Sequence, residues 1–170
     1  MNRVFFFLTI LLLGYHATAF GQTLDYKFQS LFVYNIAKYT QWSAIHSSGN
    51  LVIGILGNKS IAETFAKSYQ DKKIGNQSIS IVNYANAADI RYCNILFIPY
   101  STKVDLDNIL AYWGNKDVLI CTEHEGWGLK GSTVNLVIVD GKIKIEINSA
   151  SVKKAGIKIA SNLTSLATVL

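Results

Sequence analysis

The sequence predicts an α/β sandwich with a mixed, mostly parallel sheet of about six strands, helices on both faces and a late antiparallel hairpin. Short apolar runs alternate with helical patterns from residue 51 to residue 121, the order that βαβ units produce. The stretch 133–148 then sets two apolar-rich runs around Asp140-Gly141, and an Asp-Gly pair between such runs is the strongest short-range hairpin signal. Alternating elements followed by a hairpin give a mixed sheet covered by helices.

Residues 1–19 have the pattern of a secretory signal peptide. Arg3 provides the positive start, residues 4–13 form the apolar stretch, and Ala17-Thr18-Ala19 is a small-residue cleavage signal. The apolar stretch is shorter than the roughly 20 residues that span a membrane. We therefore expect residues 20–170 to form one exported domain without a membrane span, which in a bacterium is periplasmic.

The composition limits the classes of function. Half of the residues are hydrophobic and 16% are charged, which excludes a disordered chain. Without Arg3 the chain has 15 basic and 11 acidic residues, and the lysines are scattered singly or in pairs. This mildly basic surface does not support nucleic-acid binding.

An amphipathic helix is predicted over residues 24–42. Its expected inner face carries apolar side chains at helical spacing, and Asn35 falls inside the same stripe. A buried amide needs partners, so Asn35 is interpreted as a structural bracket to the backbone, with a ligand contact as the alternative. The apolar members of the expected face are Leu24, Phe28, Leu31, Phe32, Tyr39 and Trp42.

The elements that follow alternate between strands and helices. Ser60 and Glu63 predict a capping box for one helix, Gly114 ends the next, and Ser149 is expected to cap the last. Strands are expected at 51–56, 78–84, 95–98 and 118–121, and helices at 61–69, 105–113 and 150–155.

The hairpin has a well-specified register. Counting outward from the turn places aliphatic side chains on one face, and a slip of one residue would move them all to the other face. The second face pairs Asn135 with Glu146 and is expected to be a rim or a partly wet layer. The predicted pairs are Val139 with Lys142, Ile138 with Ile143, Val137 with Lys144, Leu136 with Ile145 and Val134 with Ile147.

Two cysteines remain in a chain that is expected to be exported, where a disulfide is chemically permitted. If residues 99–117 form a crossover, Cys93 precedes one parallel strand and Cys121 ends the next. Their Cα atoms would then be about 10 Å apart or more, beyond the reach of a disulfide. An unbonded pair is therefore the favoured interpretation.

Four stretches in order resemble the YfiR-like family of bacterial periplasmic proteins. They are 34–39 with Trp42, 93–98, the hairpin ending Ile145-Glu146-Ile147-Asn148, and the closing Leu166-Ala167. Ahead of the hairpin, family members have an aromatic residue and then Gly-Gly-Met-Ile. Trp127 matches the aromatic residue and Gly131 one glycine, and Ser132-Thr133-Val134 replaces the rest. Structural roles are expected for Asn35, Trp42, Asp140, Gly141 and Asn148.

The resemblance implies a non-enzymatic regulator. The best-known relative is a periplasmic repressor that holds the outer domain of an inner-membrane diguanylate cyclase inactive, and so controls cyclic-di-GMP signalling and biofilm growth. The expected partner is therefore the periplasmic domain of a membrane signalling protein, with a homodimer left open. No cofactor is implied.

Candidate binding residues lie in the loops that follow parallel strands, where α/β sheets bind ligands. Asn58 and Glu123 provide polar groups that could bind a ligand, and the other candidate binding residues are Tyr100, Ser101 and Trp127. A mixture of aromatic and polar groups suits a peptide or a small molecule, so a solute-binding protein is the alternative function, and ordinary connecting loops are the non-functional alternative.

Catalytic and metal-binding patterns are weak. No G-x-S-x-G, H-E-x-x-H, C-x-x-C or P-loop motif occurs, and the sequence predicts neither a catalytic nor a metal site. Among the three histidines, only His124 has acidic neighbours, Glu123 and Glu125. A hydrolase built from Ser101, His124 and a carboxylate is a third hypothesis that no spacing specifically supports.

Overall fold

The computed structural model describes residues 26–43 and 48–170, so the predicted signal peptide and His46 lie outside the described part. Its main sheet has eight strands in the order β10-β8-β7-β6-β5-β2-β4-β3. The pairs β2–β4, β2–β5, β5–β6, β6–β7 and β8–β10 are parallel. The fold class is confirmed, and the two strands beyond the expected six are two-residue edges.

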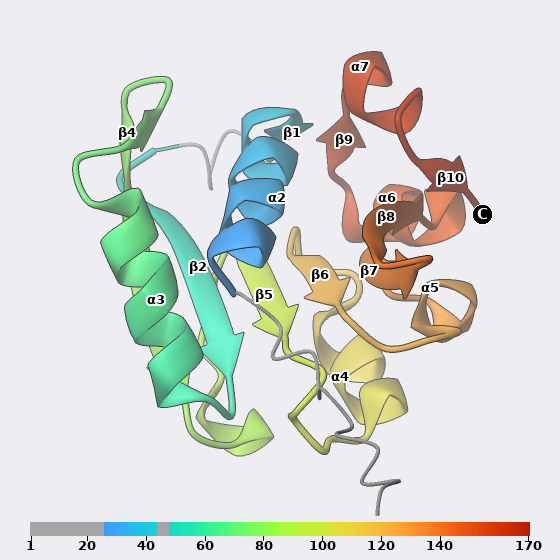
Figure 1. Ribbon diagram of the computed structural model, residues 1–170, viewed down its shortest axis with the longest axis horizontal. Helices are drawn as coiled ribbons and strands as arrows, with labels where there is room; N and C mark the ends of the chain where they lie inside the picture. The colour runs from blue at the N-terminus through green and yellow to red at the C-terminus, as the bar shows by residue number, and fades with distance from the viewer. Residues whose placement is uncertain (1–25, 44–47) are drawn as a thin grey trace, which may run out of the picture.

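The strands and helices alternate along the chain as expected (Figure 1). The sheet contains β2 (Leu51–Leu56), β3 (Lys73–Ile74), β4 (Gln77–Tyr84), β5 (Ile95–Ile98), β6 (Leu119–Thr122), β7 (Val134–Val139), β8 (Lys142–Ile147) and β10 (Thr168–Val169). A separate antiparallel pair joins β1 (Thr40–Gln41) to β9 (Lys158–Ile159). The helices are α2 (Tyr26–Lys38), α3 (Lys59–Tyr69), α4 (Leu106–Trp113), α5 (Trp127–Lys130), α6 (Ser149–Ala155) and α7 (Ser161–Thr164).

The sheet separates two hydrophobic clusters. The larger joins α2, α3 and the C-terminal segment to alternate strand residues such as Ile53, Phe97 and Leu136. The smaller lies on the opposite face, where Ile109 of α4 packs with Leu96 and Ile120. Buried parallel strands need apolar side chains on both faces, which explains why β5 and β6 are continuously apolar or small.

The hairpin of β7 and β8 has the predicted register at every pair. Asp140 and Gly141 have φ angles of 51° and 71°, which is the conformation that a two-residue hairpin turn requires. Leu136 and Ile145 are buried, whereas Ile138 near the turn is 50% exposed. The hairpin prediction is confirmed, and its aliphatic face is buried only in the part distant from the turn.

The inner face predicted for residues 24–42 is confirmed at Phe32, Tyr39 and Trp42, which pack against the larger cluster, and is wrong at two positions. Leu24 lies outside the described residues. Phe28 and Leu31 were expected inside, but they are 61% and 50% exposed. The buried side chains of the helix are Gln29, Ser30, Val33, Ile36 and Ala37. The helix has apolar residues on both sides. The periodicity therefore could not show which of the two sides packs on the sheet.

Two predicted N-caps are also shifted. Asn58, not Ser60, caps α3 by accepting a hydrogen bond from the Ile61 N–H at 3.1 Å. Asn148, not Ser149, caps α6 by accepting from the Ser151 N–H at 2.9 Å. Each helix starts one or two residues closer to the preceding strand than the serine pattern indicated.

The cysteines are free and lie in different clusters on opposite faces of the sheet. Burial raises the pKa of the Cys93 thiol to about 12 and raises that of Cys121 well above its usual value. Both thiols therefore stay protonated and unreactive at neutral pH, and the expectation of an unbonded pair is confirmed.

Trp42 and Asn35, two residues with expected structural roles, are both half-buried. The Trp42 indole donates to the Asn94 carbonyl at 3.1 Å and so ties the end of α2 to the start of β5. The side chain of Asn94 in turn accepts from the Val52 N–H at 2.8 Å. Asn35 is half-buried, and its bracketing role stays a prediction.

Candidate functional site

The carboxyl ends of β2, β5 and β6 lie side by side because these strands are parallel neighbours. The three loops that leave them carry all five predicted binding residues, and hydrogen bonds join four of these residues in two pairs. Asn58 donates to the Ser101 hydroxyl at 3.4 Å, and the Tyr100 N–H donates to Glu123 at 3.2 Å. We call Asn58, Tyr100, Ser101, Glu123 and Trp127 the strand-end site.

Glu123 is the buried centre of this site. Only 9% of it is exposed, and burial raises the pKa of its carboxyl group. Hydrogen bonds from the Tyr100 N–H, the Tyr26 hydroxyl and the Gln29 amide favour the ionised form and limit that increase. A carboxylate that receives donors from α2 and from the loop after β5 fixes these two elements to each other.

Tyr26 and Gln29 belong to the site but were missed by sequence reasoning. Neither is among the residues expected on the inner face of the helix. The ring of Tyr26 packs edge-on against Phe97 at 6.5 Å, and its pKa is raised by burial and then by the negative Glu123. Gln29 is 3% exposed, and its carbonyl oxygen has no hydrogen-bond partner within residues 26–43 and 48–170. No sequence signal identifies them, because the burial of Gln29 follows from how α2 packs on the sheet.

An aromatic stack forms the exposed side of the site. The His124 imidazole stacks on Trp127 with ring centroids 3.9 Å apart and an interplanar angle of 18°, and the Tyr100 ring lies 5.2 Å from the imidazole. Burial lowers the pKa of His124, so the imidazole is neutral at neutral pH. Tyr100 is 63% exposed and offers its ring to a partner.

The geometry does not assemble the hydrolase constellation. His124 is directed to the backbone carbonyls of Pro99 and Thr102, while the Ser101 hydroxyl bonds with Asn58 and Tyr26. Among residues 26–43 and 48–170, no hydrogen bond joins Ser101 to the His124 imidazole. Within the same residues, no group of three His, Cys, Asp or Glu side chains is placed to hold a metal ion.

A buried polar network supports the loop from behind. The Asn135 amide donates to the His124 carbonyl and to Glu146, each at 2.8 Å, and its oxygen accepts from Thr122 at 2.7 Å. Asn135, Thr122 and Ser132 are fully buried. The second face of the hairpin, expected as a rim or a partly wet layer, is therefore buried and fully bonded at Asn135.

Helix α5 sits close to β8 because residue 128 is a glycine. A Cβ atom at Gly128 would lie 2.5 Å from a Glu146 carboxylate oxygen and 2.8 Å from Leu170. The Asn148 amide donates to the Gly128 carbonyl at 2.9 Å, and the Ser151 hydroxyl donates to the Gly131 carbonyl at 2.8 Å. The turn that carries Trp127 is therefore held on two sides, and the structural role of Asn148 stays a prediction.

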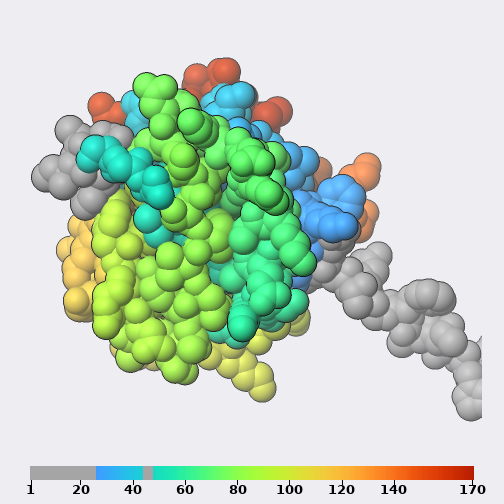
Figure 2. Space-filling view, turned by 90° about the vertical axis from the view of Figure 1, so that its left-hand side faces the viewer, coloured from blue at the N-terminus to red at the C-terminus, as the bar shows by residue number. Residues whose placement is uncertain are grey.

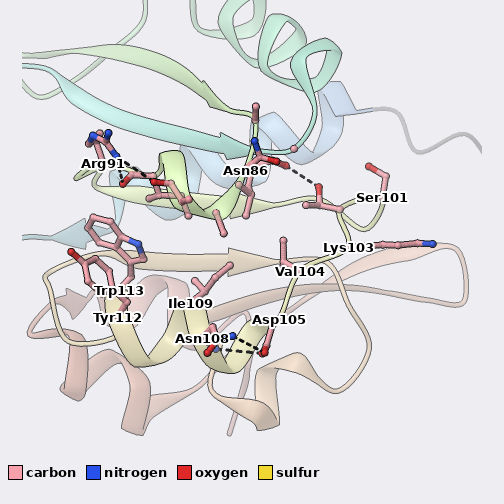
Figure 3. A pocket seen from close by; sticks show the side chains of 17 residues that line it. Asn86, Arg91, Ser101, Lys103, Val104, Asp105, Asn108, Ile109, Tyr112 and Trp113 are labelled. Carbon is pink, nitrogen blue, oxygen red and sulfur yellow. Dashed lines mark hydrogen bonds between the residues drawn. The ribbon is translucent and has the colours of Figure 1, made fainter.

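A cleft of about 790 Å³ opens beside the strand-end site, between α4 and the connector after β4. Ser101 is the one strand-end residue in its lining (Figure 3). Arg91 and Lys103 bring positive charge, and Arg91 donates to the Asp89 and Ile90 carbonyls at 3.3 Å. Its other labelled lining residues are Asn86, Val104, Asp105, Asn108, Ile109, Tyr112 and Trp113.

Comparison with known families places this fold. The model of the YfiR/HmsC-like family matches residues 26–168. The chain belongs to the YfiR/HmsC-like family. YfiR/HmsC-like proteins are periplasmic regulators in signalling and are regulatory rather than catalytic. The family match spans the strand-end site and the hairpin, so both belong to the shared domain.

A solved structure supports the fold of this YfiR/HmsC-like chain. The crystal structure of a conserved domain protein from Vibrio cholerae is similar at a TM-score of 0.51 and 12% identity. The alignment covers 85% of this chain and 60% of that one. No curated protein sequence matches. Within the described residues, no helix combines the length and apolar character that crossing a bilayer requires.

Replacing Asn135 with alanine should lower the free energy of unfolding by about 1–3 kcal/mol, because the buried Thr122 hydroxyl and His124 carbonyl lose their partner. Urea denaturation monitored by circular dichroism measures the change. Asn76→Ala, at an exposed asparagine between β3 and β4, is the control and should stay within about 0.5 kcal/mol of the parent. Equal effects of the two substitutions would show that the network does not support the fold.

Glu123→Gln should remove a pH dependence from folding stability. The folded-state pKa of Glu123 is raised above its usual value of 4.5, so its stabilising contribution is complete below that pH and is lost as pH rises through the folded pKa. The difference in unfolding free energy, variant minus parent, should therefore increase from about pH 4 towards neutrality. Chemical denaturation across this range tests the sign, and a decreasing difference would contradict it.

Proposed function

We propose that this protein is an exported, non-enzymatic regulator that binds the periplasmic domain of a membrane signalling protein, as a repressor of a diguanylate cyclase or a related sensor. The observation that carries the proposal is the Tyr100–His124–Trp127 stack. It presents the exposed Tyr100 ring on the loop after β5, which Glu123 holds, beside the loop after β6, which Asn135 holds. Rigid aromatic residues supply contact area at low entropic cost and are enriched among interface hot spots.

Repression requires the regulator to bind one conformation of its partner more tightly than the other. A preformed surface favours such discrimination, because little ordering free energy is lost on binding. The strand-end site is suited to this role since its supports are buried and its contact surface is exposed. A homodimer would place two such surfaces on one particle and remains a prediction.

A second candidate function is the binding of a small molecule, and the cleft beside α4 is the observation that favours it. Its size lies within the range of small-molecule pockets. Ser101 is common to the cleft and the strand-end site, so a bound solute would change the surface offered to a partner. In that case the protein would act as a sensor as well as a binder.

Tyr100→Ala should weaken partner binding by a factor of about 10 to 30 or more, the effect of removing a hot-spot aromatic residue. The fold should be unaffected, because 63% of Tyr100 is exposed. Affinity capture from detergent-solubilised membranes with residues 20–170 as bait identifies the partner, and biolayer interferometry with its periplasmic domain measures affinity. Tyr112→Ala is the matched control, since Tyr112 is 60% exposed on α4. Capture of no membrane signalling protein would refute the proposed function.

Small-molecule binding is tested by thermal shift across a panel of metabolites. A ligand at 100 times its Kd should add about 2.7 kcal/mol of stability. Tyr112→Ala should abolish the shift because it removes one wall of the cleft, and Tyr100→Ala should leave it unchanged. A shift that responds to the Tyr100 variant alone would place the ligand outside the cleft.

A further inference from the structure

Positive charge is concentrated on the layer formed by α2, α3 and the turn that follows α3. Residues 26–38 and 59–73 contain six lysines and two acidic residues, a net charge of +4. The other described residues contain nine basic and eight acidic side chains, a net charge of +1. All six lysines of the layer are exposed, namely Lys27, Lys38, Lys59, Lys67, Lys72 and Lys73. The surplus charge therefore lies on one layer, although the lysines are scattered in the sequence.

A groove of about 550 Å³ runs between α2 and α3 within this layer. Lys27, Lys67 and Lys72 line it, and no acidic side chain does. Its hydroxyl groups, on Ser30, Thr64 and Ser68, donate to backbone carbonyls of their own helices at 2.7 to 3.0 Å. The ammonium groups of Lys67 and Lys72 are therefore donors that the groove offers to an occupant.

Two large apolar side chains stand beside these lysines. Phe28 and Leu31 are 61% and 50% exposed, and Leu31 also lines the groove. They are exposed because α2 turns Gln29 and Ser30 towards the sheet. Lysines around exposed aromatic and aliphatic side chains on one helical surface form the pattern of a membrane-surface contact. We call Lys27, Phe28, Leu31, Lys67 and Lys72 the α2–α3 face. Figure 2 shows the molecule from the side on which α3 lies.

The kind of cation on this face indicates the kind of anion. All its basic residues are lysines, which act as point charges, whereas specific binding of a carboxylate typically uses the planar fork of arginine. The Lys72 ammonium lies 5.2 Å from the Tyr34 ring centroid, which keeps that charge at the end of the groove. Point charges beside apolar side chains fit a diffuse layer of lipid phosphates better than a defined acidic peptide.

We propose that the α2–α3 face docks on an anionic phospholipid surface, with Phe28 and Leu31 entering the headgroup region and the lysines pairing with lipid phosphates. This goes beyond the proposed function, because it holds the protein at the membrane independently of any protein partner. Each lysine near such a surface contributes roughly a fivefold gain in affinity. The two contacts are compatible, since the strand-end site and the α2–α3 face use different residues.

The test is co-sedimentation of residues 20–170 with large unilamellar vesicles. Vesicles that contain phosphatidylglycerol should bind the protein, pure phosphatidylcholine vesicles should not, and high salt should weaken binding. Lys67→Gln with Lys72→Gln should reduce binding by roughly 25-fold, the product of two fivefold effects. Lys153→Gln with Lys154→Gln, two exposed lysines of α6, is the charge-matched control and should change binding little.

The apolar contribution is tested in the same way. Phe28→Ser with Leu31→Ser should weaken vesicle binding, and the control Ile138→Ser with Val139→Ser, an exposed pair near the hairpin turn, should not. Absence of binding to anionic vesicles, or equal loss in the control pairs, would overturn the proposal. The proposal would also be overturned if the Lys67/Lys72 or Phe28/Leu31 variants lost partner capture in detergent but bound vesicles as the parent does. The α2–α3 face would then be a protein interface. If the parent protein captures no membrane signalling protein, the proposed function is refuted. Vesicle binding still decides whether the α2–α3 face docks on lipid.

Discussion

The buried amide of Asn135 connects the hairpin to the loop after β6, which carries Glu123 and Trp127 of the strand-end site. Its hydrogen bonds reach β6 through Thr122, β8 through Glu146 and the site loop through the His124 carbonyl. A completely buried amide must satisfy its donors and acceptor, which fixes the relative positions of these three elements. The position of the aromatic stack therefore follows from a residue that no partner can touch.

The orientation of α2 is the second constraint, and it creates two surfaces at once. Turning Gln29 and Tyr26 inward gives Glu123 its partners, and the same rotation leaves Phe28 and Leu31 outside. The first turn of the helix thus contributes to the strand-end site on one side and to the α2–α3 face on the other. Polar side chains are buried here because a buried carboxylate requires donors.

The exposed groups of the described residues supply contact surface. The Ser101 hydroxyl accepts a hydrogen bond from Asn58, and burial raises the pKa values of the Cys93 and Cys121 thiols. The exposed groups are aromatic rings and lysines, which supply contact area and attraction. A regulator at a membrane benefits from both, since residence on the bilayer raises the local concentration of a membrane-bound partner.

The sequence by itself determined the local features of this protein. The Asp140-Gly141 turn set the hairpin register, the apolar runs located β2, β5 and β6, and the order of elements predicted which loops would meet. Parallel neighbours end at one edge, so Asn58, Tyr100, Ser101, Glu123 and Trp127 could be grouped before their contacts were known. Four short stretches also indicated the family, because each has a residue pattern that can be read without coordinates.

Only the tertiary structure decided which face of α2 is buried. It also showed that Asn135, and not the aliphatic face alone, anchors the hairpin, and that the surplus lysines share one layer. Periodicity reports that a helix has two faces, and it cannot rank them when both carry apolar residues. Burial of Gln29, pairing of Glu123 with Tyr26 and concentration of charge on the α2–α3 face join residues far apart in the chain. Such pairings depend on how helices pack on the sheet, and that information is spread over the whole sequence.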